Sequence, residues 1–329
     1  MPIIPMNRPI ARSLAAVTLL LTLPSHLVFG TVAVAQEASA ERAMWIELGT
    51  RSGPVPSADR SQPAHLLKWG DQTILIDVGD GAAEQLAKVG VMPADIDAIV
   101  ISHLHFDHIG GLFGLLGMRY QASLTGAAPL VIYGPPGTQA IVDNLLAAFT
   151  PATALTRMPA ATYEVRELQD GARVNIGGIA VTVAGNSHYD LWPDAAARPV
   201  SLSYRFDAPG RSIVYTGDTG PSRAVETLAA GADLLVSEIM DVESALAPVR
   251  SGGARLSADE EAFIRDHFTK QHLVPDEVGK LAAAAGVKAL VVTHFGGASS
   301  DPEQIPRLTG QIRAHYSGPV TFARDLDKF

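Results

Sequence analysis

The chain of 329 residues is acidic, with a formal net charge of −9, and it contains no cysteine. Hydrophobic residues make up 47% of the sequence, enough to build the core of one large domain, which we expect over residues 41–329. The lack of thiols excludes disulfide bonds and thiolate metal ligands. The negative charge disfavours binding to nucleic acid phosphates.

The first residues predict a secretory signal peptide over 1–35. Arg8 and Arg12 precede an apolar run from Leu14 to Leu23, and residues 33–35, Ala-Val-Ala, supply a cleavage site. Residues 38–40, Ala-Ser-Ala, supply a second site, so we expect cleavage after residue 35 or 40. Because the apolar run is too short to span a bilayer, we predict an exported protein, periplasmic or secreted, without a stable membrane anchor after cleavage.

Short apolar runs rich in β-branched residues predict strands at 45–48, 65–69, 73–76, 98–102, 129–133, 163–168, 174–183, 200–206, 212–217, 234–238 and 289–294. Helices are predicted over 82–89 and 139–149, after the capping box of Ser257 and Glu260, and from Pro275 to Gly286. Residues 239–256 contain Gly252-Gly253 and are predicted to be an irregular lid or pocket wall.

The strand predicted at 98–102 is followed by His103-Leu104-His105-Phe106-Asp107-His108 and two glycines. Three imidazoles and a carboxylate within six residues are ligands suited to zinc or a similar divalent ion. The alternative is a polar loop whose histidines only cap the strand. That alternative explains a single histidine better than it explains four ligand residues in this order.

Other predicted strands also lead to residues that bind metals. Asp77 follows the strand at 73–76, His188 the strand at 174–183, and Asp218 the strand at 212–217. Glu238 and His294 end two later strands. His26, His65, His267 and His315 lie outside this pattern and are expected to be ordinary surface or packing residues.

In this order the motifs resemble the metallo-β-lactamase superfamily. The resemblance implies an α+β fold, a four-layer αβ/βα sandwich of two mixed β-sheets with helices on the outer faces. It assigns His103, His105 and His188 to one metal ion and Asp107, His108 and His294 to a second, with Asp218 shared. It gives Asp77 the role of bracing the metal-binding loop through hydrogen bonds.

Several motifs are similar to one branch, the tRNA 3′-processing endonucleases (ribonuclease Z) with related phosphodiesterases and arylsulfatases. They are Leu48-Gly49-Thr50, residues 77–81, residues 134–137 and residues 215–219. In the RNA enzymes an acid–histidine pair helps to protonate the leaving group. The resemblance therefore makes His272, supported by Glu238, the expected general acid. Asp107 is expected to be catalytic as well as a metal ligand.

The expected function is that of a hydrolase with two divalent ions, Zn²⁺ before Mn²⁺ or iron, and a hydroxide that bridges them. No basic arm is evident between Thr138 and His188. With the acidic charge and the predicted export, this favours a small phosphodiester, phosphate ester or sulfate ester over nucleic acid as substrate. The alternatives are a lactone, carboxylic ester or β-lactam hydrolase, and a non-catalytic metal-binding or partner-binding protein. The sequence is compatible with a homodimer and does not decide the oligomeric state.

Overall fold

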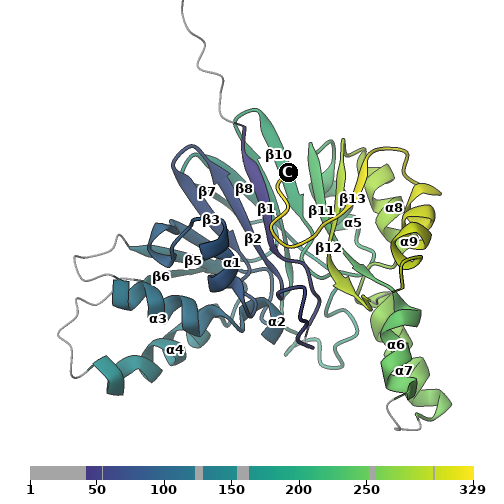
Figure 1. The fold of residues 1–329 in the computed structure, drawn as a ribbon, viewed down its shortest axis with the longest axis horizontal. Coiled ribbons are helices and arrows are strands. Elements are labelled where there is room, and N and C mark those ends of the chain that lie inside the picture. The colour runs from purple at the N-terminus through teal and green to yellow at the C-terminus, as the bar shows by residue number, and fades with distance from the viewer. Residues whose placement is uncertain (1–41, 54, 123–128, 154–162, 252–255, 299–300) are drawn as a thin grey trace, which may run out of the picture. The chain divides into compact units, whose positions relative to one another are not determined.

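The structure is a computed structural model that describes residues 42–53, 55–122, 129–153, 163–251, 256–298 and 301–329 (Figure 1). The predicted signal peptide and both of its cleavage sites lie outside these ranges. Across the described ranges, no helix combines the length and the apolar character needed to cross a membrane.

The first β-sheet contains six strands that neighbour one another in chain order. The strands are β1 (Met44–Gly49), β2 (Ala64–Trp69), β3 (Gln72–Ile76), β4 (Ala98–Val100), β5 (Leu130–Gly134) and β6 (Tyr163–Glu167). β1, β2 and β3 pair antiparallel, whereas β3 to β6 pair parallel, so the sheet is mixed.

The second sheet has seven strands in the order β13-β12-β11-β10-β9-β8-β7. Their bounds are β7 (Arg173–Ile176), β8 (Ile179–Gly185), β9 (Leu202–Ala208), β10 (Arg211–Tyr215), β11 (Leu234–Met240), β12 (Leu290–Gly296) and β13 (Val320–Phe322). β10 to β13 pair parallel and β7 to β10 pair antiparallel, so this sheet is mixed as well.

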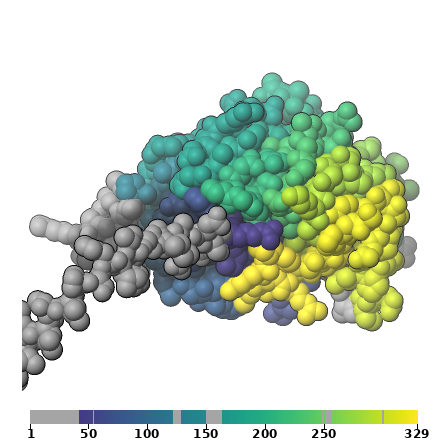
Figure 2. Space-filling view, turned by 90° about the horizontal axis from the view of Figure 1, so that it is seen from above, coloured from purple at the N-terminus to yellow at the C-terminus, as the bar shows by residue number. Residues whose placement is uncertain are grey.

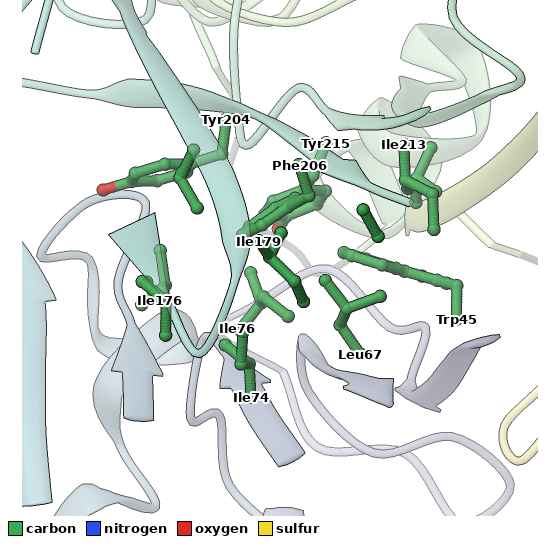
Figure 3. Close-up of a cluster of buried hydrophobic side chains, with 14 of the residues drawn as sticks. Trp45, Leu67, Ile74, Ile76, Ile176, Ile179, Tyr204, Phe206, Ile213 and Tyr215 are labelled. Atoms are coloured by element: carbon green, nitrogen blue, oxygen red, sulfur yellow. The ribbon is translucent and has the colours of Figure 1, made fainter. Parts of the chain in front are cut away.

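Alternate residues of the central strands face two different cores, because successive side chains of a strand point to opposite faces. In β3, Ile74 and Ile76 pack between the two sheets with Trp45 and Tyr215 (Figure 3), whereas Leu75 packs on the outer side. Strands that are buried on both faces need apolar residues at nearly every position, which explains the continuous apolar runs in the sequence.

Helices cover the outer face of each sheet. α1 (Ala82–Lys88), α3 (Leu112–Ala122) and α4 (Thr138–Thr153) share a core with the first sheet. α5 (Arg223–Ala229), α8 (Pro275–Ala285) and α9 (Gln304–Arg313) share a core with the second. The four layers confirm the predicted αβ/βα sandwich.

The prediction of an irregular segment over 239–256 is wrong. β11 continues to Met240, and α6 (Val242–Ser251) follows, while residues 252–255 lie outside the described ranges. The two glycines directed the prediction, but Leu246 is fully buried on one side of the helix and stabilises it. α7 (Ala258–Lys270) begins at the predicted capping box. Ion pairs from Arg265 to Glu243 and from Arg250 to Glu261 join α6 to α7.

The sequence did not predict α3, α5, α9 and β13, nor the short η1 (Pro93–Asp95) and α2 (Phe106–Ile109). The single strand predicted over 174–183 is wrong, because a turn at Gly177-Gly178 divides it into β7 and β8. After β13 the chain runs back along β1, where the backbone N–H of Trp45 donates to the carbonyl of Phe329 at 3.0 Å and the N–H of Phe329 donates in return at 2.8 Å. Figure 2 shows these last residues, in yellow, against the purple N-terminal strand. The tail therefore covers an edge of the first sheet.

Candidate metal centre and active site

The seven predicted ligands come together where strands of both sheets end or become irregular. His103, His105, Asp107 and His108 follow β4, the last two within α2, while His188 and Asp218 follow β8 and β10. His294 lies inside β12, and Glu238 lies in β11 at a shift in strand register. Donor atoms within 4.8 Å of one another define three groups: His103, His105, His188 and Asp218; Asp107, His108 and His294; and Asp218, Glu238, His272 and His294.

Three imidazole nitrogens converge in the first group. Nδ1 of His105 lies 3.0 Å from Nε2 of His103 and 3.1 Å from Nε2 of His188. Nδ1 of His188 lies 2.9 Å from the carbonyl oxygen of Gln271, so it must carry the hydrogen and leave a lone pair on Nε2. Burial lowers the pKa of all three histidines, that of His188 to about 3. Neutral rings with converging nitrogens suit a divalent cation.

The second group contains a buried polar atom without a hydrogen-bond partner, Nε2 of His108. Oδ1 of Asp218, 3.4 Å away, is also buried and without a partner. Nε2 of His294 lies 3.3 Å from carboxylate oxygens of both Asp107 and Asp218. Burial opposes ionisation of these carboxyls, but His108 and His294 lower the pKa of each. Such an arrangement of donors fits a cation, which would satisfy the unpaired atoms.

Asp77 braces this group from beneath. Its carboxylate accepts from the backbone N–H of Ser102 at 2.7 Å, from the Ser102 hydroxyl at 2.8 Å and from the Tyr215 hydroxyl at 2.8 Å. Nδ1 of His108 lies 2.8 Å from the same carboxylate. Asp77 itself has a φ of 54°, a backbone conformation that persists only where the surroundings enforce it. The sequence indicated Asp77 but gave no signal for Ser102 or Tyr215.

A carboxyl–imidazole pair stands next to the second group. Nδ1 of His272 lies 2.6 Å from Oε2 of Glu238, and the backbone N–H of Thr219 donates to Oε1 at 2.6 Å. Burial, assisted by the Asp218 carboxylate, raises the pKa of Glu238, and burial lowers the pKa of His272. Nδ1 of His272 is 3.9 Å from Asp218. The pair is therefore close enough to act on a group bound at the candidate ligands. Its membership of the third group makes metal binding an alternative role.

A buried network that the sequence did not reveal lies behind His294. Glu47 accepts from Trp45 Nε1 at 2.8 Å and from the hydroxyl of Thr293 at 2.7 Å, and Nδ1 of His65 lies 2.8 Å away. His65 was expected to be a packing residue, and its ring indeed stacks on Trp45. Thr293 precedes His294, whose φ of 41° is also in the left-handed region. The network thus links β1 and β2 to the backbone next to a predicted ligand.

These groups form the floor of a cavity of about 580 Å³. His105, Asp107, Asp218, His272 and His294 all line it, together with Arg51 after β1 and residues of α6 and α7. His267 of α7 lines it too, although the sequence offered no reason to separate this histidine from a surface residue. The volume is in the range of small-molecule sites.

The chain resembles known proteins over most of its length. The family described as "Beta-lactamase superfamily domain" matches residues 72–295. Ribonuclease Z of Mycolicibacterium gilvum is 34% identical over 259 residues, covering 75% of this chain and 82% of the relative. Ribonuclease Z of Mycobacterium bovis BCG is 31% identical over 292 residues, covering 85% of this chain and 95% of the relative.

Solved structures share the fold. The metallo-β-lactamase fold protein YhfI of Bacillus subtilis has a TM-score of 0.65 at 21% identity, covering 88% of this chain and 99% of its own. The short form of human tRNase Z has a TM-score of 0.60 at 23% identity, with 87% and 98% covered. A diphosphatase of the PhnP family has a TM-score of 0.59 at 19% identity, with 88% and 97% covered.

The names of these relatives bear on one expectation from the sequence. We expected no nucleic acid partner, yet the related sequences are named for a ribonuclease, so the acidic charge is not a sufficient reason to exclude RNA. The predicted family, by contrast, is confirmed. The chain belongs to the metallo-β-lactamase superfamily of hydrolases, in the branch that contains ribonuclease Z and related phosphodiesterases.

Proposed function

We propose that this hydrolase cleaves small phosphodiesters, or related phosphate and sulfate esters, with the help of two divalent ions. The observation that carries the proposal is the pair of unpartnered buried atoms, Nε2 of His108 and Oδ1 of Asp218, next to a cavity that Asp218 and His272 line. Leaving such atoms unpaired costs about 1–3 kcal/mol each, which cation binding would remove. If these residues served only to pack the core, nothing would offset that cost.

The donor groups support a division of the ligands between two ions. We assign His103, His105 and His188 to one ion and Asp107, His108 and His294 to the other, with the Asp218 carboxylate shared. Bound there, the ions would supply a water that ionises near neutral pH and would polarise the ester. The imidazole and carboxylate donors favour Zn²⁺, with Mn²⁺ or iron as alternatives.

Residues of the chain itself would orient the ligand His108 and protonate the leaving oxygen of the substrate. Asp77 holds Nδ1 of His108, which fixes the ring so that Nε2 faces the ligand group. Since Nδ1 of His272 is engaged by Glu238, the ring nitrogen left for the substrate is Nε2. We assign to His272 the transfer of a proton from Nε2 to the leaving oxygen, while Nδ1 takes the proton that it shares with Glu238.

A small substrate is favoured by the site itself. The cavity of about 580 Å³ has the volume of a small-molecule pocket. Because the sequence relatives are named ribonuclease Z, RNA is the competing substrate that the experiment must include. A lactone, carboxylic ester or β-lactam is the alternative within the same fold, and a non-catalytic metal-binding protein is the alternative of another class.

The experiment is a hydrolysis screen of the protein after reconstitution with Zn²⁺ or Mn²⁺. The substrates are bis(p-nitrophenyl) phosphate, p-nitrophenyl sulfate, a lactone, nitrocefin and a single-stranded RNA, and Asp218→Asn is the inactive control. We expect the phosphodiester or the sulfate ester to give the highest kcat/KM, with activity lost on chelation and restored by metal. A higher kcat/KM for RNA, lactone or nitrocefin would overturn the proposed substrate class. Metal binding without any hydrolysis would favour the non-catalytic alternative.

We also propose that residues 1–35 direct export. The support is the Arg-flanked apolar run and the Ala-rich cleavage sites of the sequence. N-terminal sequencing of the protein recovered from its native host tests this. A mature chain that begins at residue 36 or 41 is expected, and a chain that retains Met1 would contradict export by cleavage.

A further inference from the structure

We infer that the cavity selects a small anionic ester that carries an apolar group, with Arg51 binding the negative charge and Phe268 packing against the apolar group. The inference rests on the proposed function and names its substrate class more closely. Two independent features of the cavity wall support it, one polar and one apolar.

The polar feature is Arg51, the one permanently charged cation among the residues that line the cavity. Its Nε is buried and has no hydrogen-bond partner, and Nη1 makes only a long contact of 3.4 Å to the carbonyl of Ala298. The Arg51 side chain also lines a neighbouring cavity with Asp59, whose pKa its charge helps to lower, but among the described residues it forms no ion pair with that carboxylate. Nη2 makes no hydrogen bond within the described residues and is not among their buried unpaired atoms, so Arg51 retains a donor for a ligand.

The backbone places Arg51 next to the predicted metal ligands. Arg51 forms an isolated parallel bridge with Phe295, the residue after His294. Two residues further on, the N–H of Gly53 donates to Oδ2 of Asp107 at 2.7 Å. A guanidinium on this segment can bind an anionic oxygen of an ester whose reacting atom lies over the ligand group. Planar paired donors of this kind match phosphate and sulfate oxygens.

The apolar feature is a wall of hydrophobic side chains. Its members come from five parts of the chain: Val55, Phe106, Met240 with Ala245, Phe268 and Ala298. Val55 and Phe106 are 58% and 67% exposed, so the wall continues to the mouth of the cavity. Apolar surface of this kind in a functional cavity indicates an apolar ligand group, because removing the surface from water lowers the free energy.

Helix α7 presents Phe268 to the cavity as part of a braced pair of helices. Arg265 Nη1 lies 2.6 Å from Glu243 of α6, and Arg250 of α6 pairs with Glu261 of α7. Phe268 is half-buried and lines the cavity, whereas Phe263, on the same helix, is 77% exposed and does not line it. The chain thus offers a matched control of the same residue type.

The experiment measures binding of two non-chromogenic diesters to the zinc-reconstituted full chain by calorimetry. Diphenyl phosphate and dimethyl phosphate carry the same charge and differ in their apolar groups. We expect the wild type to bind diphenyl phosphate about 10-fold or more tightly than dimethyl phosphate. Phe268→Ala should remove most of this ratio, and Phe268→Leu should keep most of it. Phe263→Ala should leave it unchanged.

Arg51→Gln should weaken both diesters equally, by about 10–100-fold, because one charge-assisted interaction is lost from each. Arg166→Gln, an exposed arginine of β6, is the control and should bind like the wild type. Unchanged binding in Arg51→Gln, or an unchanged ratio in Phe268→Ala with a native circular dichroism spectrum, would overturn the inference. The proposed function fails separately, if the wild type binds diphenyl phosphate but hydrolyses no phosphodiester or sulfate ester.

Discussion

Glu238 and His272 form a buried pair in which Oε2 of the carboxyl lies 2.6 Å from Nδ1 of the imidazole. The second carboxyl oxygen accepts from the backbone N–H of Thr219, so the carboxyl is held at both ends. The ring of His272 lies parallel to that of His294, with centroids 6.1 Å apart. The pair is thus fixed beside the candidate metal ligands, with Nδ1 engaged by Glu238 and Nε2 as the nitrogen that remains for a substrate.

The first prediction follows from this pair. If His272 protonates the leaving oxygen, His272→Ala should slow substrates with basic leaving groups far more than p-nitrophenyl esters, since p-nitrophenolate departs without a proton. General acid catalysis typically contributes about 10²–10⁴-fold where it is needed. The measurement is kcat/KM over a leaving-group series of esters for wild type and variant, each with metal content determined.

The control for this series is His315→Ala, at a surface histidine 3.3 Å from Asp276. It should match the wild type over the whole series. An equal slowdown across the series in His272→Ala would make His272 a substrate-positioning group. Loss of metal in that variant would make it a ligand, in line with the donor group that it forms with Asp218, Glu238 and His294.

The second prediction compares Asp218 with Asp77. Asp218 offers donor atoms to two of the candidate groups, whereas Asp77 reaches the site through His108 and Ser102. We expect Asp218→Ala to abolish measurable activity, and Asp77→Ala to cost about 10–100-fold in activity or metal affinity. Activity and bound metal are measured on folded variants. The opposite ranking would show that the shared ligand has been assigned to the wrong carboxylate.

The third prediction concerns metal content and stability. Seven donor residues exceed the needs of one tetrahedral ion, so elemental analysis of the reconstituted protein should give close to two divalent ions per chain. Chelation should lower Tm, because binding to the folded state alone stabilises it and because buried atoms such as Nε2 of His108 lose their partner. A stoichiometry of one or less after reconstitution, or a Tm unaffected by chelation, would contradict the assignment.

The sequence predicted most of the strands and the clustering of His103 to His108 because both depend on local patterns. Residues such as Ile74 and Val100 occupy apolar runs, and His103 to His108 are concentrated in six positions. The contributions of Ser102, Tyr215 and Glu47 could not be predicted, because each acts through a contact between segments far apart in the chain. Arg51 was missed for a similar reason, since its lack of a partner is a property of the folded cavity.

The last prediction concerns acid stability and the junction of β10 and β11. The Asp233 carboxylate accepts from the N–H of Ser212 at 2.7 Å and from its hydroxyl at 3.0 Å, and Lys288 Nζ lies 2.7 Å away. The bond from Lys288, with help from Ser212, lowers the pKa of Asp233 from 3.8 to about 2. A lowered pKa in the folded state means that the ionised carboxylate stabilises the fold above pH 3.8 and that this contribution is lost as the pH falls toward 2.

Asp233→Asn should therefore lower the free energy of unfolding by about 1 kcal/mol at pH 6, and the difference from wild type should shrink between pH 4 and pH 2. Urea unfolding of both proteins over this pH range measures it. Asp266→Asn removes an exposed ion pair with Lys270 on α7 and should change stability by less than about 0.5 kcal/mol. A difference for Asp233→Asn that stays constant down to pH 2 would mean that the carboxylate's charge does not hold this junction.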